Sequence, residues 1–315
     1  MVESNVVVWI ASPRKLPRAK ELAGRVVVLD IAFASEASGG GFEKITKPLI
    51  DGLGSRLAAW VDHHDHDEHV HYANDPRFLL RTKAQHPACP ELIDEALVAR
   101  IGPIDTIVCH GDFDGLCSAA KWLIGGREPY EGADHDARCI DTRTGKPGPI
   151  GDQLDRAIRA NARDENLGRL LVRYLAGGLL DTNARRHIDA VADTLAAREK
   201  AARRVGQKYQ ILTTERGSKA PRVAWLDASP HHGSYDRTTL LLDGQARAGV
   251  AVVRDRENVT LAAPFESGLN FLELLGLSGG MPTVVSISAK RLDEALKLLG
   301  ISKADRLLLG SEDLT

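Results

Sequence analysis

The stretch IDTIVCHGDFDGLCSAAKWLIGG, residues 104–126, decides the fold class that we predict for this chain. Its first part, Ile104–His110, is a largely apolar and β-branched run, which is typical of a buried strand. Leu116–Ile124 is predicted to be a helix that stops at the glycine pair after it, since glycine favours the end of a helix. A buried strand that leads straight into a helix is the unit of a parallel sheet covered by helices.

Further apolar runs before this stretch indicate a sheet of several strands. They are Val6–Ala11, Arg25–Phe33 and Leu57–Asp62, and Pro17–Ala23 is predicted to be a short helix. We therefore expect an α/β domain with a parallel sheet over residues 1–190. The ligand site of such a sheet lies at the carboxyl ends of its strands, where this sequence places Asp and His.

The rest of the chain changes pattern and predicts a second domain. Asn183–Gly206 is rich in Ala, Arg and Glu, and we assign residues 191–206 to a connecting helix with a solvated charged face. Residues 207–315 predict a smaller α+β domain with short strands and two helices. The expected strands are Arg222–Asp227, Thr238–Leu242, Gly249–Arg254, Val259–Ala263 and Thr283–Ser288, and the expected helices are Asn270–Leu275 and Arg291–Leu299.

Composition excludes several classes of protein. The 315 residues are 43% hydrophobic and 27% charged, which is the balance of a globular protein. With 41 basic and 43 acidic residues the net charge is −2, which excludes a uniformly basic protein that coats nucleic acid without sequence preference. No apolar run approaches the ~18–20 residues of a membrane span, and the start of the chain predicts a strand, not an export signal. The four cysteines form no Cys-x-x-Cys pair and are expected to be buried thiols, so we expect a cytoplasmic protein.

The segment after the 104–110 strand carries a possible metal-binding pattern. His110, Asp112 and Asp114 alternate, so in an extended conformation their side chains point to one side, at roughly 6.6 Å per two residues. Oxygen and imidazole ligands beside a helix N-terminus suit a manganese or magnesium centre that acts on a phosphoester. A polar turn without metal is the alternative interpretation.

A second segment has the same chemistry. Five of the eleven histidines lie between Asp62 and His71. Asp62, His63 and His64 follow an apolar run and are predicted to lie at the edge of the sheet. The remaining polar residues are predicted to form a solvated acidic loop, in which a metal-binding role of the histidines stays open: Asp65, His66, Asp67, Glu68, His69 and His71.

Asp30 closes another apolar run, VVVLD. A buried carboxylate is costly unless it is paired, so Asp30 is either a metal ligand or a helix N-cap.

The two segments together resemble the DHH phosphoesterases. The resemblance rests on Asp62-His63-His64 and on His110-x-Asp112-x-Asp114-Gly115-x-x-Ser118-Ala119. That family includes RecJ-type exonucleases, nanoRNA and pAp phosphatases, cyclic-dinucleotide phosphodiesterases and family II pyrophosphatases. The resemblance covers most of residues 1–190 and, more weakly, the C-terminal domain.

The resemblance implies a role for each matching residue. His110 and Asp112 would bind one metal ion, Asp114 and His63 a second, and Asp30 would bridge the two. Asp62 would orient His63, and His64 would face the phosphate. The predicted catalytic residues are therefore Asp62, His64 and Asp114.

Three further positions match the family less closely. Asp181, in the stretch YLAGGLLDT of residues 174–182, is our predicted last ligand, and Asp141, in CIDTRTG of residues 139–145, is its rival. Arg143 resembles a basic residue of the family's substrate channel. Gly279 and Gly280 resemble the glycine-rich loop that holds substrate, although Met281 stands where the family has histidine.

The order of the motifs departs from the family. The His-x-Asp-x-Asp motif is usually first and the Asp-His-His motif third, whereas here Asp30 and Asp62–His64 precede His110. A parallel sheet tolerates this order if the chain ends have moved, so we predict a circularly permuted DHH-type domain.

These observations predict a manganese-dependent phosphoesterase with two metal ions, with magnesium as the alternative metal. The expected substrate is a phosphodiester or phosphomonoester of a nucleotide or short oligonucleotide, bound without any membrane partner. A catalytically inactive regulator that binds nucleotides and a pyrophosphatase are the competing hypotheses. The oligomeric state stays open, a homodimer included.

Overall fold

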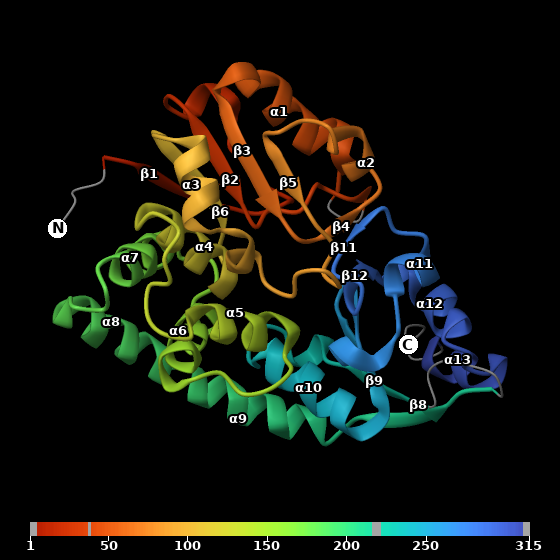
Figure 1. Cartoon of the computed structure of the whole chain (residues 1–315). Helices are drawn as coiled ribbons and strands as arrows, with labels where there is room; N and C mark the ends of the chain where they lie inside the picture. Colours follow the sequence, from red (N-terminus) through yellow and green to blue (C-terminus); the bar gives the residue numbers. More distant parts are fainter. Residues whose placement is uncertain (1–4, 37–38, 216–221, 311–315) are drawn as a thin grey trace. The chain divides into compact units, whose positions relative to one another are not determined.

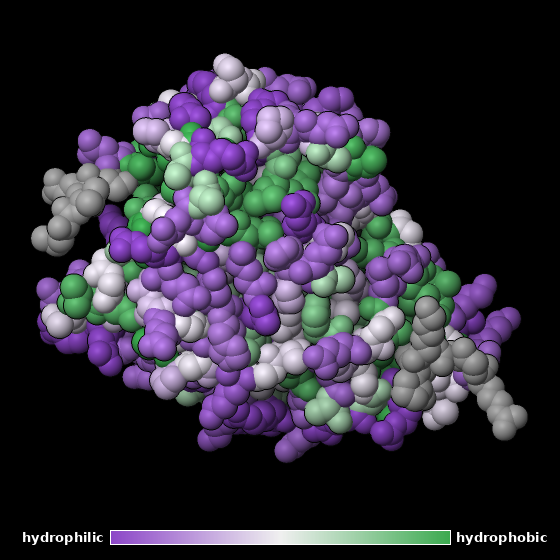
Figure 2. Space-filling model, viewed as in Figure 1, coloured by the Kyte–Doolittle hydropathy of each residue, from purple (hydrophilic) through white to green (hydrophobic). Residues whose placement is uncertain are grey.

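The computed structural model describes residues 5–36, 39–215 and 222–310. The chain divides into two compact units, the first made of Met1–Leu195 with Ser278–Gly280 and the second of Ala196–Leu277 with Met281–Thr315. No helix among the described residues is long and apolar enough to cross a membrane. Hydrophilic side chains dominate the visible face, with smaller hydrophobic areas between them (Figure 2).

The first unit is built on a five-stranded sheet in which every neighbouring pair of strands is parallel (Figure 1). The predicted parallel sheet is thus confirmed. Its strands, in spatial order, are β1 (Val7–Ala11), β6 (Thr106–His110), β2 (Val26–Leu29), β3 (Leu57–Asp62) and β5 (Phe78–Leu80).

The sheet is apolar on both faces because both faces are covered. Along β2, Val27 and Leu29 belong to one core cluster, whereas Val26 and Val28 belong to another. This alternation is that of a strand whose successive side chains point to opposite faces. Leu116 of α4 (Phe113–Leu123) packs in the first cluster, and side chains of α1 (Lys47–Leu53) pack in the second.

The helices of the first unit alternate with the strands and then run in succession. Their bounds are α1 (Lys47–Leu53), α2 (His69–Tyr72), α3 (Glu95–Ile101), α4 (Phe113–Leu123), α5 (Ala133–Thr142), α6 (Pro149–Ala160), α7 (Glu165–Ala176) and α8 (Thr182–Asp193). A short antiparallel pair joins β4 (Asp65–His66) to β11 (Gly279–Gly280).

The second unit has a mixed five-stranded sheet. Only β8 and β9 are parallel among its neighbouring strands. In spatial order the strands are β12 (Val284–Ser288), β10 (Asn258–Ala262), β9 (Gly249–Asp255), β8 (Arg222–Asp227) and β7 (Gln210–Thr213). The helices are α9 (Leu195–Gly206), α10 (Arg237–Ala248), α11 (Phe271–Leu275), α12 (Leu292–Leu298) and α13 (Lys303–Gly310).

The structure corrects several predicted elements. The expected strand Thr238–Leu242 lies inside α10, because Asp236 caps that helix through the Thr239 amide at 2.7 Å and Leu240 and Leu241 are buried on one helix face. The expected helix Asn183–Gly206 is two helices that meet at Thr194. The predicted helix at Pro17–Ala23 shortens to a three-residue turn of 3₁₀ helix, Ala19–Glu21.

Another correction concerns the predicted metal segment. The strand ends at His110 and α4 begins at Phe113, three residues earlier than expected. Asp112 is the N-cap, and its side chain accepts a hydrogen bond from the Gly115 amide at 3.3 Å. Asp114 therefore lies in the first turn of a helix and not in an extended segment.

Candidate metal centre

Three neighbouring strands end at the same edge of the sheet with ionisable residues. Asp30 directly follows β2, His63 directly follows β3, and His110 is the last residue of β6. In the sheet β6 pairs with β2, and β2 pairs with β3. The parallel ladder thereby brings together side chains that are far apart in the sequence.

Asp30 is almost fully buried. The residue is 1% exposed, and neither carboxylate oxygen has a hydrogen-bond partner among the described residues. Its backbone has a φ of 56°, in the left-handed region that non-glycine residues seldom adopt. Burial, together with Asp114 and Asp112, raises the pKa of Asp30 well above its usual value. A buried carboxylate without donors fits a bound cation.

His63 directs one ring nitrogen at this carboxylate. Its Nδ1 lies 2.8 Å from the carbonyl oxygen of His86, which can only accept, so Nδ1 carries a proton and, in the neutral ring, Nε2 is the nitrogen with the lone pair. Nε2 lies 3.1 Å from Oδ1 of Asp30 and 3.3 Å from Oδ2 of Asp114. This is the tautomer in which an imidazole can bind a metal ion.

His110 and Asp112 form the other side of the group. His110 Nδ1 lies 2.7 Å from Oδ2 of Asp112 and 3.8 Å from Oδ2 of Asp30. Burial opposes the charged form of His110, but the carboxylates, Asp112 foremost, raise its pKa to about 10. Protons and metal ions therefore compete for His110 in this site.

The ligand atoms fall into three sets, each with its atoms within 4.8 Å of one another. The sets are Asp30, His63 and His64; Asp30, His110 and Asp112; and His63, Asp114 and Asp141. Carboxylate and imidazole donors without cysteine suit manganese or magnesium better than structural zinc. The donor set and the orphaned oxygens of Asp30 both fit a divalent metal site.

Asp181 is not a member of any of these sets. Asp181 is exposed and caps α8, where its side chain accepts hydrogen bonds from the amides of Asn183 and Ala184 at 2.9 and 3.0 Å. Asp141, its rival, belongs to the third set. The geometry therefore favours Asp141 over Asp181, and a helix cap accounts for Asp181.

Asp62 and His64 form a pair beside the cluster. His64 Nδ1 lies 2.8 Å from Oδ1 of Asp62 and 3.9 Å from Oδ1 of Asp30. Burial alone would raise the pKa of Asp62, but His64 and its neighbours lower it to about 2. Asp62 therefore orients His64, whereas the family resemblance implied that it would orient His63. The carbonyl of His86 orients His63 instead.

The predicted substrate residues lie in two places. Arg143, with a left-handed φ of 55°, directs its guanidinium at Asp155 with contacts of 2.9 and 3.2 Å. Gly279 and Gly280 pair with His66 and Asp65, the residues just after the Asp-His-His motif. A Cβ on Gly279 would lie 2.3 Å from Cδ2 of His66, so this pairing requires glycine.

Two of the three additional histidines pack against an aromatic ring. The rings of His66 and His69 lie 5.7 and 4.9 Å from that of Phe33, centroid to centroid. Burial lowers the pKa of His69 to about 4 and also lowers that of His66. His71 is exposed. None of these three histidines belongs to a group of described residues whose ligand atoms lie close enough together to hold a metal ion.

Lys83 is a member of the cluster that the sequence analysis missed. Its side chain is fully buried, its Nζ forms an ion pair with Asp141, and the same Nζ lies 2.8 Å from Nε2 of His63. Burial would lower the pKa of Lys83, but Asp141, Asp114 and Asp30 raise it above the usual value. Nothing in its surrounding sequence, RTKAQHP, distinguishes it from a surface lysine.

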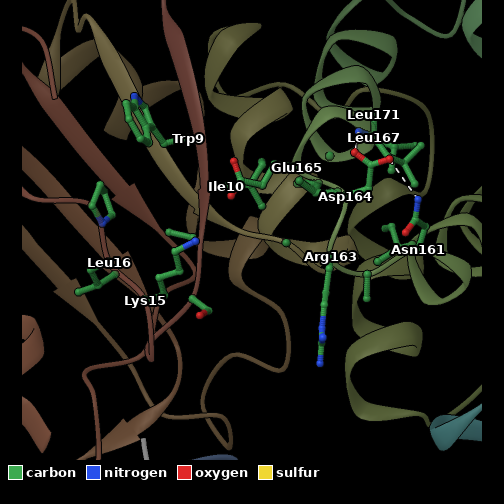
Figure 3. Close-up of a pocket in the computed structure, with 18 of the residues that line it drawn as sticks. Trp9, Ile10, Lys15, Leu16, Asn161, Arg163, Asp164, Glu165, Leu167 and Leu171 are labelled. Atoms are coloured by element: carbon green, nitrogen blue, oxygen red, sulfur yellow. Dashed lines mark hydrogen bonds between the residues drawn. The ribbon is translucent and has the colours of Figure 1, made fainter. Parts of the chain in front are cut away.

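The first unit contains a cavity of about 510 Å³ (Figure 3). Gly111, between His110 and Asp112, is one of its lining residues. Trp9, Lys15 and Leu16 line one side, and residues at the start of α7 line the other (Figure 3). The lining combines apolar side chains, such as Leu116 and Leu167, with charged groups, such as Arg163 and Glu165.

Comparisons with known proteins find a likeness among solved structures. No protein-family model matches the chain, and no curated protein sequence matches it significantly. Among solved structures, the chain is similar to the crystal structure of exonuclease RecJ bound to manganese, with 14% identity, a TM-score of 0.44, and coverage of 90% of this chain and 77% of that chain.

Proposed function

We propose that this protein is a divalent-metal-dependent phosphoesterase that hydrolyses a nucleotide or a short oligonucleotide. The observation that carries the proposal is the convergence of Asp30, His63 and His110 from three neighbouring strands, with an unpartnered carboxylate at the centre. Carboxylate-rich sites with imidazole are suited to manganese or magnesium, and manganese is our first choice.

We assign the residues of the cluster different roles. Asp30, His110 and Asp112 would hold a metal ion, and His63 and Asp114 extend the site. A bound divalent ion lowers the pKa of water and neutralises charge on a phosphoryl group. His64, held by Asp62 at 2.8 Å, would donate to the phosphate beside Asp30.

We also propose the circular permutation. The strands that carry the family's first, second and third motifs, β6, β2 and β3, lie side by side in that order. Their order along the chain is β2, β3, β6. A site needs its ligands to meet in space and not in sequence, so the shuffled order is compatible with the same centre.

The cavity beside Gly111 is our proposed place for the rest of the substrate. Its volume of about 510 Å³ is in the range of small-ligand sites. An apolar lining with polar groups around it suits a nucleobase with its sugar. The net charge of −2 favours a small substrate over long duplex DNA, which needs many phosphate contacts.

The test is hydrolysis by the purified full chain with manganese. The panel is bis(p-nitrophenyl) phosphate, pAp, short RNA, cyclic dinucleotides and pyrophosphate. We expect turnover of a nucleotide substrate that Asp114→Ala abolishes. Asp94→Asn is the matched control, because Asp94 is an exposed helix cap whose side chain accepts from the Leu97 amide at 2.7 Å.

Three results would overturn the proposal or redirect it. Full activity in Asp114→Ala would remove the cluster from the reaction. Turnover of pyrophosphate alone would favour a pyrophosphatase. Tight nucleotide binding without turnover of any compound would favour the regulator.

A further inference from the structure

Lys83 occupies the third of the three ligand sets. That set consists of His63, Asp114 and Asp141. Lys83 Nζ contacts two of its three members, Asp141 through an ion pair and Nε2 of His63 at 2.8 Å. Building on the metal-dependent function proposed above, we propose that the ammonium group of Lys83 replaces a second metal ion, so that the centre binds one divalent ion, at Asp30, His110 and Asp112.

The contact between Lys83 and His63 determines whether His63 can bind a metal ion. Because Nδ1 donates to the His86 carbonyl, the lone pair on Nε2 is the one available to an electrophile. Lys83 is a donor only, so its approach to 2.8 Å uses that lone pair. A metal ion bound by His63 would need the same lone pair, and the lysine and the ion therefore exclude each other.

Lys83 is held in place along its whole length. Its side chain is 0% exposed, and its amide donates to Oδ2 of Asp65 at 3.4 Å. The backbone turns directly after it, where the amides of Gln85 and His86 both donate to the Thr82 carbonyl at 3.0 Å. Withdrawal of the ammonium would leave buried carboxylates uncompensated, which is strongly unfavourable.

The other set has no lysine paired with it within the described part of the chain; its positive partner is His110, one of its own members. Both oxygens of Asp30 lack a hydrogen-bond partner among the described residues, and the salt bridges of Asp112 in that part of the chain involve His110 alone. An ion at Asp30, His110 and Asp112 would thus meet the two unpartnered oxygens of Asp30. The two sets differ in kind: the cation of one is Lys83, which is a donor only, whereas the cation of the other is His110, whose ring nitrogen can exchange its proton for a metal ion.

The test is the metal stoichiometry of the full chain, which needs no substrate. Calorimetric titration with Mn²⁺ alone and elemental analysis after gel filtration give the ions per chain, and electron paramagnetic resonance separates isolated Mn²⁺ from exchange-coupled pairs. We expect one isolated ion in the wild type. Lys83→Ala should admit a second, coupled ion, whereas Lys121→Ala should not. Lys121 is the matched control, because it is another buried lysine, paired with Asp134 at 2.5 Å.

Asp141→Asn keeps the proposal testable if Lys83→Ala does not fold. If Asp141 binds Lys83 and not a metal, the variant retains one ion per chain. Asp112→Asn removes a proposed ligand and should weaken binding by at least the roughly 10- to 100-fold that is typical of changing an outer-shell partner. Two ions in the wild type, or loss of an ion in Asp141→Asn, would overturn the inference and leave the phosphoesterase proposal intact. One ion in Lys83→Ala would also overturn it. No manganese binding in the wild type would overturn both.

Discussion

Acidification should destabilise the first unit through His69. The ring of His69 lies 4.9 Å from that of Phe33, edge to face, and its Nε2 is buried without a hydrogen-bond partner among the described residues. Burial lowers its pKa from 6.5 to about 4, so folding favours the neutral imidazole. The resulting stability is complete above the unfolded pKa and is lost as the pH falls from 6.5 towards 4.

The size of the effect follows from this pKa difference. Between pH 4 and 6.5 the unfolded chain binds more protons at this position, and each pKa unit corresponds to about 1.4 kcal/mol. At pH 5, where most carboxylates are still ionised, the expected loss relative to pH 7 is about 2 kcal/mol.

The assay is urea unfolding at pH 7 and pH 5, followed by tryptophan fluorescence, for the wild type and for His69→Gln. Glutamine does not titrate, so the variant should lose about 2 kcal/mol less than the wild type on acidification. The comparison cancels the carboxylates that both proteins share. Equal losses in the two proteins would refute the reasoning and show that His69 titrates normally in the folded state.

Three other changes test separate parts of the structure. Asp30→Asn should remove a carboxylate ligand and abolish the rise in Tm on adding MnCl₂, whereas a Tm rise equal to that of the wild type would show that Asp30 binds no ion. Gly279→Ala should break the pairing of Gly279 with His66, because the alanine Cβ would lie 2.3 Å from Cδ2 of the His66 ring. The amide of Asp67 donates to the Ser278 carbonyl next to this pair, so the loss of pairing should appear as faster hydrogen exchange of that amide. Asp181→Ala should cost about 1 kcal/mol of stability in urea unfolding through the lost cap and leave the affinity for manganese unchanged; a weaker affinity would return Asp181 to the metal site.

Much of the first sheet could be predicted because its strands are locally distinctive. Leu57–Asp62 is a strand with the predicted bounds, since a fully buried strand needs a continuous apolar run. Phe78–Leu80 was missed because three residues carry no periodicity. The strand predicted at Thr238–Leu242 was wrong, because the Asp236 cap and the buried face of the helix outweigh the β-branched residues at its start.

The candidate site was predictable where its residues end strands. Asp30, His63 and His110 follow apolar runs, and the sheet brings such ends together. The choice between Asp141 and Asp181 was not predictable, since both are followed by threonine and only the fold shows that one of them caps a helix. Lys83 lies in a loop, where the burial of a lysine depends on tertiary packing that leaves no local pattern.

The placement of the cluster on adjacent strands also bears on how such a centre could diversify. Hydrogen bonds between β6, β2 and β3 fix the spacing of the three anchor points, so a replacement of one terminal side chain alters the chemistry without shifting the scaffold. Metal preference and substrate choice can then change by substitution at the strand ends while the sheet stays the same.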